Sequence, residues 1–156
     1  MYSFMQKKQQ QLHNGTPDLY LNVAINILSF SSRVEHTLSV PLKKFGLTLP
    51  QFNTLRILSA EFPDPLILNK LTVKMIDRSS NTSRLVDKLV EKKLAVRQPS
   101  KTDRRLIHIF ITENGLKLVA EVSQILELIV EKQLCSDEKK DMEALIDCLK
   151  MMREAS

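Results

Sequence analysis

The sequence predicts a mainly α-helical fold with one small β-hairpin, and three observations lead to this fold class. Apolar residues recur at steps of three and four before residue 93 and after residue 112, which is the spacing of amphipathic helices. Between these segments, isoleucine occupies every second position from Ile107 to Ile111, as in a short strand. The polar run Gln98 to Arg105 joins that strand, predicted over Leu106 to Ile111, to another over Leu94 to Arg97. The predicted order is four helices, a hairpin and two helices.

The first predicted helix begins at Leu19. Six apolar positions recur along it at helical steps, namely Leu19, Val23, Ile27, Phe30, Val34 and Leu38. Pro41 lies in its C-terminal part, and because proline lacks a backbone N–H we expect it to kink or end the helix. Gly46 can supply the left-handed residue that closes the segment.

The second helix has a clear start signal. Thr48-Leu49-Pro50-Gln51 matches a capping box, in which the Thr48 hydroxyl and the Gln51 side chain satisfy exposed backbone amides. Its expected inner face consists of Phe52, Leu55 and Leu58. The segment Phe62 to Pro65 follows as a stiff connection, since its two prolines fix the backbone.

Two shorter helices come next. The third is predicted around Asn69 to Met75, and Asp77 to Ser80 then provides turn and cap residues before the fourth, roughly Ser80 to Lys92. The apolar stripe of the fourth helix is Leu85, Val86, Leu89 and Val90. Projection at about 100° per residue places the following residues on the opposite face: Ser80, Arg84, Asp87, Lys88 and Glu91. Asn81 and Ser83 lie on the flanks, and Thr82 lies near the apolar side.

The C-terminal part predicts two more helices. Thr112 to Gly115 caps a long helix with a wide apolar face, made of Leu116, Val119, Val122, Leu126, Ile129 and Val130. Ser136 begins the last helix, which carries Met142, Leu145, Ile146 and Leu149. Together with the first helix, these faces offer more apolar surface than the intervening lobe can cover. We therefore expect pairing between chains, with intrachain packing as the alternative.

Length and composition predict one globular core. The chain has 156 residues, of which 43% are hydrophobic. Its two cysteines, Cys135 and Cys148, form no disulfide framework, so a reducing cytoplasmic environment is expected. Residues 1–18 contain no continuous apolar run, and no later stretch approaches about 18 uninterrupted apolar residues. We expect a cytoplasmic protein that is neither exported nor membrane-spanning.

The positive charge is concentrated in one segment. Between Leu68 and His108 lie eleven basic and four acidic side chains, a net charge of +7, whereas the whole chain carries +5. The rest of the chain is therefore slightly acidic. This concentration of charge indicates either a basic face exposed to solvent or a surface that binds a polyanionic partner.

The third and fourth helices, joined by a tight turn, describe a helix-turn-helix. The second helix of such a motif can enter the roughly 12 Å wide major groove of double-stranded DNA, where its N-terminal side chains meet base edges first. The side chains at that end are small and supply hydrogen-bonding groups, namely those of Ser79, Ser80, Asn81 and Ser83. Arg84 adds a planar guanidinium group, whose N–H donors suit a guanine edge or a phosphate. The alternative is a helix cap followed by a solvated face.

The predicted hairpin tip supports the interpretation that the protein binds DNA. It contains Lys101, Arg104 and Arg105 with one acid, Asp103, which is placed to accept from Arg105 and fix its direction. Such an arm beside a recognition helix can reach the adjacent minor groove or its phosphates. The sequence therefore predicts a winged helix-turn-helix.

Several linked blocks also resemble a known family. Ser80 to Leu89, Leu94 to Arg97, Asp103 to Arg105 and Ile111 to Gly115 are similar to the signature of the MarR family of bacterial transcriptional regulators. The detailed similarity covers about Leu47 to Gly115. Lys93 departs from the pattern, because the family commonly has glycine after the recognition helix. A lysine can adopt the left-handed conformation there at a cost of roughly 1 kcal/mol, so the departure concerns the local turn geometry and not the fold.

The resemblance implies an organisation and a mode of action. It implies a tail over residues 1–17, a dimerisation helix over 18–46, a winged helix-turn-helix lobe over 47–112 and C-terminal dimerisation helices over 113–156. The homodimer would repress transcription from a pseudo-palindromic operator and be released by a small lipophilic effector, an oxidant or a metal. Ser80, Asn81, Ser83, Arg84 and Lys88 would lie on the recognition helix. Arg104 and Arg105 would lie on the wing, where Asp103 and Arg105 would form its Asp-x-Arg element.

Other functions have weaker support. The three histidines and two cysteines lack zinc-ligand spacing, although a composite metal sensor using Glu35, His36 or His108 stays open. Neither a nucleophile elbow nor paired catalytic carboxylates are present, so we expect no catalytic residue, no enzyme and no cofactor. Cys135 and Cys148 are more consistent with structural thiols than with a redox switch. The main alternative is a protein- or ligand-binding module that keeps this fold without reading DNA.

Overall fold

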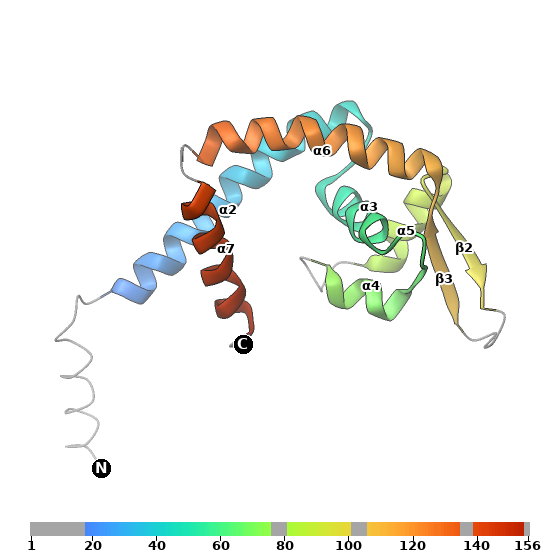
Figure 1. Ribbon diagram of the computed structural model, residues 1–156, viewed down its shortest axis with the longest axis horizontal. Coiled ribbons are helices and arrows are strands. Elements are labelled where there is room, and N and C mark those ends of the chain that lie inside the picture. Colours follow the sequence, from blue (N-terminus) through green and yellow to red (C-terminus); the bar gives the residue numbers. More distant parts are fainter. Residues whose placement is uncertain (1–17, 76–80, 101–105, 135–138, 155–156) are drawn as a thin grey trace, which may run out of the picture. The chain divides into compact units, whose positions relative to one another are not determined.

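The computed structural model describes residues 18–75, 81–100, 106–134 and 139–154. Within these ranges the elements are α2 Leu19–Lys44, α3 Leu49–Glu61, β1 Leu66–Ile67, α4 Leu68–Lys74, α5 Thr82–Glu91, β2 Ala95–Pro99, β3 Ile107–Ile111, α6 Glu113–Leu134 and α7 Lys139–Glu154 (Figure 1). The chain divides into a unit up to Thr37 and a second unit from Leu38 onward. The predicted fold class, mainly helical with a small hairpin, is confirmed.

Helix α2 continues through Pro41, so the proline does not end it. The helix closes where Gly46 N–H donates to the Lys43 carbonyl at 3.0 Å and Leu47 N–H donates to the Leu42 carbonyl at 3.0 Å. Gly46 has a φ of 66°, the left-handed conformation that a residue without Cβ adopts at no steric cost. The predicted role of Gly46 is confirmed.

Helix α3 begins with the predicted capping box. The Gln51 N–H donates to Thr48 Oγ1 at 3.4 Å, and the Thr48 N–H donates to Gln51 Oε1 at 3.1 Å. Phe52, Leu55 and Leu58 are buried, as the apolar spacing of this helix predicts. The two reciprocal bonds fix where α3 starts and therefore which of its faces points inward.

The sheet has three antiparallel strands in the order β1-β3-β2. Strand β3 pairs with β2 from Ala95↔Ile111 to Pro99↔Ile107, and with β1 through Leu66↔Ile109 and Ile67↔His108. The hairpin prediction is confirmed, but its bounds were wrong: Gln98 and Pro99 belong to β2 and not to the loop. Pro99 is tolerated because it lies at the end of an edge strand. Strand β1 was not predicted, since two residues after a proline carry no periodicity.

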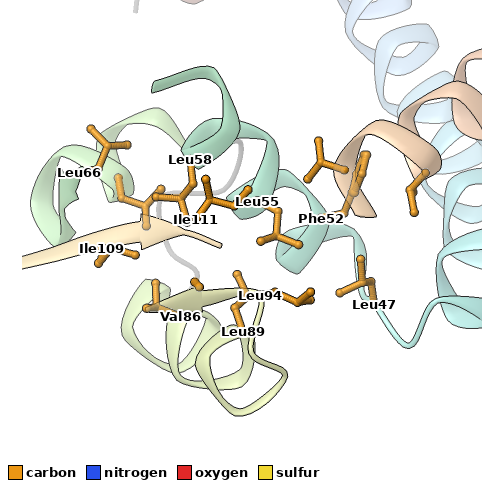
Figure 2. Close-up of a cluster of buried hydrophobic side chains, with 14 of the residues drawn as sticks. Leu47, Phe52, Leu55, Leu58, Leu66, Val86, Leu89, Leu94, Ile109 and Ile111 are labelled. Atoms are coloured by element: carbon orange, nitrogen blue, oxygen red, sulfur yellow. The ribbon is translucent and has the colours of Figure 1, made fainter. Parts of the chain in front are cut away.

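The core lies among α3, α5, β3 and α6. Figure 2 shows Leu55 and Leu58 of α3, Val86 and Leu89 of α5, and Ile109 and Ile111 of β3 gathered in one cluster. Leu55, Val86 and Leu89 are all 0% exposed. Of the predicted stripe on α5, Leu85 and Val90 are only partly buried. Because α5 contributes its buried face to this cluster, its opposite face is fixed toward solvent.

Helix α6 starts from the cap predicted at Thr112 to Gly115. Thr112 Oγ1 accepts from the Gly115 N–H at 3.1 Å and donates to the Lys93 carbonyl at 2.9 Å. Val119, Val122 and Leu126 of its predicted apolar face are buried. The predicted start of the last helix, Ser136, lies outside the described residues.

Apolar side chains of α2 and α7 stay largely exposed in the single chain. Those exposed by half or more include Tyr20 at 86%, Leu28 at 69%, Ile25 at 53%, Ile146 at 50% and Met151 at 71%. Such side chains keep half or more of their exposure to water, so these helices gain little from intrachain burial.

Candidate nucleic-acid interface

Helix α5 begins later than predicted. Asn81 has a φ of −70° and a ψ of 82°, and its Oδ1 accepts from the Arg84 N–H at 3.1 Å, so it is the N-cap and Thr82 is the first helical residue. The prediction that the helix starts at Ser80 was therefore wrong. Asparagine is among the preferred N-caps because its side-chain oxygen satisfies an amide left free at the helix start.

The two faces of α5 differ sharply. Thr82, Val86 and Leu89 are buried against the core, as predicted for Val86 and Leu89 and for the position of Thr82 near the apolar side. The exposed residues are Arg84, Asp87, Lys88 and Glu91. Lys88 Nζ lies 2.9 Å from Glu91 Oε2, an exposed ion pair that contributes little to stability.

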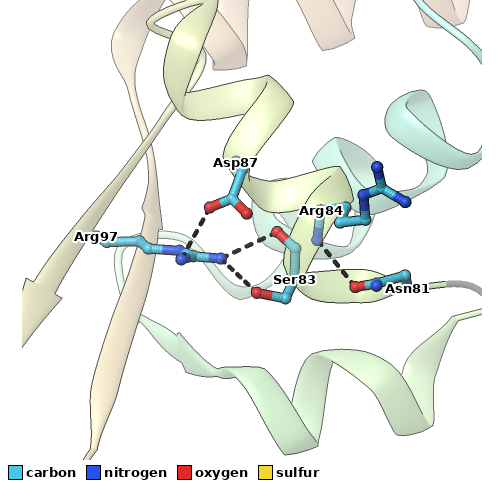
Figure 3. A network of polar contacts seen from close by, with 5 residues as sticks. All are labelled: Asn81, Ser83, Arg84, Asp87 and Arg97. Carbon is cyan, nitrogen blue, oxygen red and sulfur yellow. Dashed lines mark hydrogen bonds and ion pairs between the residues drawn. The ribbon is translucent and has the colours of Figure 1, made fainter.

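Strand β2 contacts α5 through Arg97. One of its guanidinium nitrogens, Nη1, lies 2.9 Å from Asp87 Oδ1, and the other, Nη2, donates to the Ser83 carbonyl at 3.0 Å and to Ser83 Oγ at 3.2 Å (Figure 3). The Arg97 side chain is 29% exposed. This network joins α5 to the hairpin, because one planar guanidinium contacts two residues that lie one turn apart on the same side of the helix.

Arg84 takes no part in this network. Figure 3 shows its guanidinium directed away from Asp87 and Arg97, while its backbone N–H is held by Asn81. Arg84 is exposed, and among the residues that the structure describes its guanidinium has no hydrogen-bond or ion-pair partner. It is a charged group held on a rigid helix and still available to an external acceptor.

The described part of the hairpin ends at Ser100 and begins again at Leu106. Ser100 N–H donates to the Leu106 carbonyl at 2.9 Å, which closes the hairpin immediately before the tip. The predicted tip residues Lys101, Asp103, Arg104 and Arg105 lie outside the described residues, as do Ser79 and Ser80 before α5. The structure brings together Asn81, Ser83, Arg84 and Lys88 on α5.

Arg97 is the residue that sequence reasoning missed. It was counted among the basic residues of the segment, without a role of its own. An available signal was the spacing of Ser83 and Asp87 at i and i+4, which places a hydroxyl and a carboxylate on one side of the helix. Nothing in the sequence alone indicated that β2 would pack beside that side.

The departure at Lys93 is resolved by the backbone. Lys93 has a φ of 59°, so it adopts the left-handed conformation for which the family commonly uses glycine. Its carbonyl accepts from Thr112 Oγ1 at 2.9 Å. The turn between α5 and β2 is therefore formed despite the Cβ that lysine carries.

Neither metal-binding geometry nor a transmembrane helix is found in the described ranges. Across residues 18–75, 81–100, 106–134 and 139–154, three or more His, Cys, Asp or Glu side chains never converge as metal ligands would. None of the helices in these ranges combines the length and apolarity needed to cross a membrane. Cys148 is a free, exposed thiol on α7, and Cys135 falls outside the described residues.

A helix-turn-helix beside a hairpin defines a winged helix-turn-helix protein, and comparisons with known proteins agree. A profile described as the MarR family matches residues 45–106. The HTH-type transcriptional regulator MhqR of Bacillus subtilis is 30% identical over 101 residues, which cover 60% of this chain and 68% of that protein. The HTH-type transcriptional regulator MgrA of Staphylococcus aureus is 28% identical over 105 residues, covering 67% and 70%. The chain belongs to the MarR family of transcriptional regulators.

Solved structures show the same fold at lower identity. The S. aureus MepR–DNA complex superimposes with a TM-score of 0.74 at 23% identity, covering 85% of this chain and 97% of that one. The organohalide-sensing regulator RdhR-CbdbA1625, in its 2,4-dichlorophenol-bound form, gives a TM-score of 0.78 at 16% identity, covering 90% and 83%.

Proposed function

We propose that this chain is a sequence-specific double-stranded DNA-binding regulator, which acts as a repressor in the cytoplasm. Helix α5 enters the major groove with its N-terminal turn, and the wing formed by β2 and β3 reaches the adjacent minor groove. The observation that carries this proposal is the unpartnered guanidinium of Arg84, held on the solvent face of a helix whose other face is locked into the core.

The charge distribution supports the same partner. The segment Leu68 to His108 carries a net charge of +7 and contains α4, α5 and the hairpin. DNA phosphates are the polyanion that such a surface meets in a transcriptional regulator. The tip residues Lys101, Arg104 and Arg105, oriented by Asp103, are proposed to contact phosphates beside the half-site. Ser79 and Ser80 are proposed to contact the DNA where α5 begins.

We further propose a homodimer in which α2, α6 and α7 form the interface, with the DNA-binding lobe at residues 47–112. The exposed apolar side chains of α2 and α7 support this, because a partner chain would remove them from water. Two lobes related by a two-fold axis would read two halves of a pseudo-palindrome, about 10 to 10.5 bp apart from centre to centre.

Release by a small lipophilic effector completes the proposal. The fold is shared with RdhR-CbdbA1625, which was solved with 2,4-dichlorophenol bound. An effector that binds the DNA-free arrangement more tightly than the DNA-bound one would lower the occupancy of the operator.

The test is a fluorescence-anisotropy titration of the full chain against duplexes from the upstream region of its own gene and against a shuffled duplex, at two salt concentrations. We expect tighter binding to one native duplex, and a log-log salt slope of about 0.9 for each phosphate neutralised. Equal, weak binding to every duplex would contradict the proposal and favour a module that binds protein or ligand without reading DNA.

A further inference from the structure

Three polar side chains lie at the N-terminal turn of α5: Asn81 and Arg84 are exposed, and Ser83 is half-buried. A free asparagine amide or serine hydroxyl both donates and accepts hydrogen bonds, so neither by itself prefers one kind of base edge. A guanidinium only donates. Contacts within the chain restrict what the first two can offer to a ligand.

One of the two acceptor positions on the Asn81 side-chain oxygen is used within the helix. Its Oδ1 accepts from the Arg84 N–H at 3.1 Å, because Asn81 is the N-cap of α5. The amino group Nδ2, with two N–H donors, is what the exposed side chain presents outward. Bidentate pairing of asparagine with adenine requires both the oxygen and the nitrogen, so the cap disfavours that mode of recognition.

One of the two acceptor positions on the Ser83 hydroxyl is used in a contact with the hairpin. Arg97 Nη2 donates to Ser83 Oγ at 3.2 Å and to the Ser83 carbonyl at 3.0 Å. Asp87 Oδ1 holds the same guanidinium at 2.9 Å from Nη1. With a cationic donor on its oxygen, the hydroxyl keeps its own O–H for a second partner.

We infer that the first turn of α5 is a reading surface dominated by donors, on which Asn81, Ser83 and Arg84 recognise bases by their major-groove acceptor atoms. These acceptors are guanine N7 and O6, adenine N7 and thymine O4. Cytosine N4 and adenine N6 are donors, so this surface disfavours them. Arg97 is the positioning residue that gives Ser83 its donor role.

This inference rests on the proposed function and adds to it the chemical class of the bases that α5 contacts. Phosphate oxygens are acceptors as well, so the experiment has to separate base contacts from backbone contacts. Base analogues do so, because they change one atom in the groove and leave every phosphate in place.

The test begins with selection of binding sites for the full chain from a library of random duplexes. In the selected duplex, each guanine is then replaced by 7-deazaguanine, which lacks the N7 acceptor, and each adenine by purine, which lacks only the N6 amino donor. We expect about tenfold or greater loss of affinity for 7-deazaguanine in each half-site and less than about threefold loss for purine at any position. Loss at the purine positions would overturn the inference.

The outcomes separate the inference from the proposed function. A selected duplex that tolerates every 7-deazaguanine would show that α5 makes no contact with guanine N7, which contradicts the inference and leaves specific binding intact. Failure to select any duplex would contradict both the inference and the proposed function. The site selection and the base-analogue measurements both use the unaltered chain, so their results do not depend on the folding of a variant.

The Asn81→Asp variant supplies an independent readout. Aspartate caps a helix as well as asparagine does but replaces the amino donor by an acceptor. We expect selection with this variant to shift one position of each half-site toward cytosine, whose N4 amino group needs an acceptor. An unchanged selected sequence would contradict the assignment of Asn81 to base reading.

Discussion

Arg97 on β2 lies 2.9 Å from Asp87 on α5, measured between Nη1 and Oδ1, and it donates from Nη2 to the Ser83 carbonyl one turn earlier. The hairpin and the recognition helix are therefore joined by a side-chain network in addition to the apolar core. Since Ser83 is proposed to contact DNA, this network links the stability of the lobe to the shape of its reading surface.

Replacement of Arg97 by methionine should destabilise the chain by about 1 to 2 kcal/mol, as judged by urea unfolding. The expected loss is moderate because Asp87 is half exposed and because Arg97 Nε is buried without a partner. Arg97→Lys should recover at most half of the loss, since an ammonium group cannot contact both helical positions in the planar geometry. Full stability of Arg97→Lys would show that charge alone matters there.

Lys93→Gly should stabilise the chain by about 0.5 to 1 kcal/mol. Lys93 has a φ of 59°, and removal of its Cβ relieves the steric strain of this left-handed conformation. The free energy gained in this way is larger than the entropic cost of the greater flexibility of glycine in the unfolded chain. Lys92 is the matched control: it has a φ of −82°, and its Nζ donates to the Gly46 carbonyl, so Lys92→Gly should lower stability. Equal effects of both changes in urea unfolding would contradict this account of the turn.

Gly115→Ala should destabilise the lobe by about 2 kcal/mol or more. A Cβ at this position would lie 2.3 Å from the Leu94 carbonyl oxygen and 2.7 Å from Ile111 Cγ1, and the first of these atoms belongs to the backbone. The control is Asn114→Ala, an exposed neighbour in the same first turn of α6, which should change stability by less than about 0.5 kcal/mol. Thermal unfolding monitored by circular dichroism measures both, and a stable Gly115→Ala variant would refute the close approach.

Leu28→Glu should weaken the proposed homodimer by about tenfold or more in its dissociation constant. Leu28 on α2 is 69% exposed in the single chain, so the change costs little in the monomer but places a carboxylate in the interface. The adjacent Ser29→Glu variant lies on the polar stripe of α2 and serves as the control. Sedimentation equilibrium gives both constants, and a dimer that is indifferent to Leu28→Glu would not use this face of α2.

Much of the fold was predictable because it depends on local rules. The Thr48–Gln51 capping box and the left-handed Gly46 follow from residues close together in sequence, and both predictions were confirmed. The buried face of α3 follows from helical spacing in the same way. Confirmed elements of this kind need no knowledge of distant parts of the chain.

The predictions that were wrong depend on competition between neighbouring cap residues or on contacts between residues far apart in the sequence. Ser80 and Asn81 are both good caps, and only the bond from the Arg84 N–H to Asn81 Oδ1 decides that α5 begins at Thr82. The role of Arg97 requires β2 to lie beside Ser83 and Asp87, which no local pattern encodes. The proposed contacts of Lys101, Arg104 and Arg105 stay predictions, since these residues lie outside the described ranges.

The central claim, that Arg84 reads bases from the first turn of α5, is tested most directly by one ratio of affinities. Fluorescence anisotropy gives the affinity of the Arg84→Ala variant for its selected duplex and for a shuffled duplex, with Arg56→Ala on α3 as an exposed control that removes the same charge. We predict that Arg84→Ala costs about 1 to 3 kcal/mol on the selected duplex and much less on the shuffled one. Equal losses on the two duplexes, or the same losses for Arg56→Ala, would contradict base reading by Arg84.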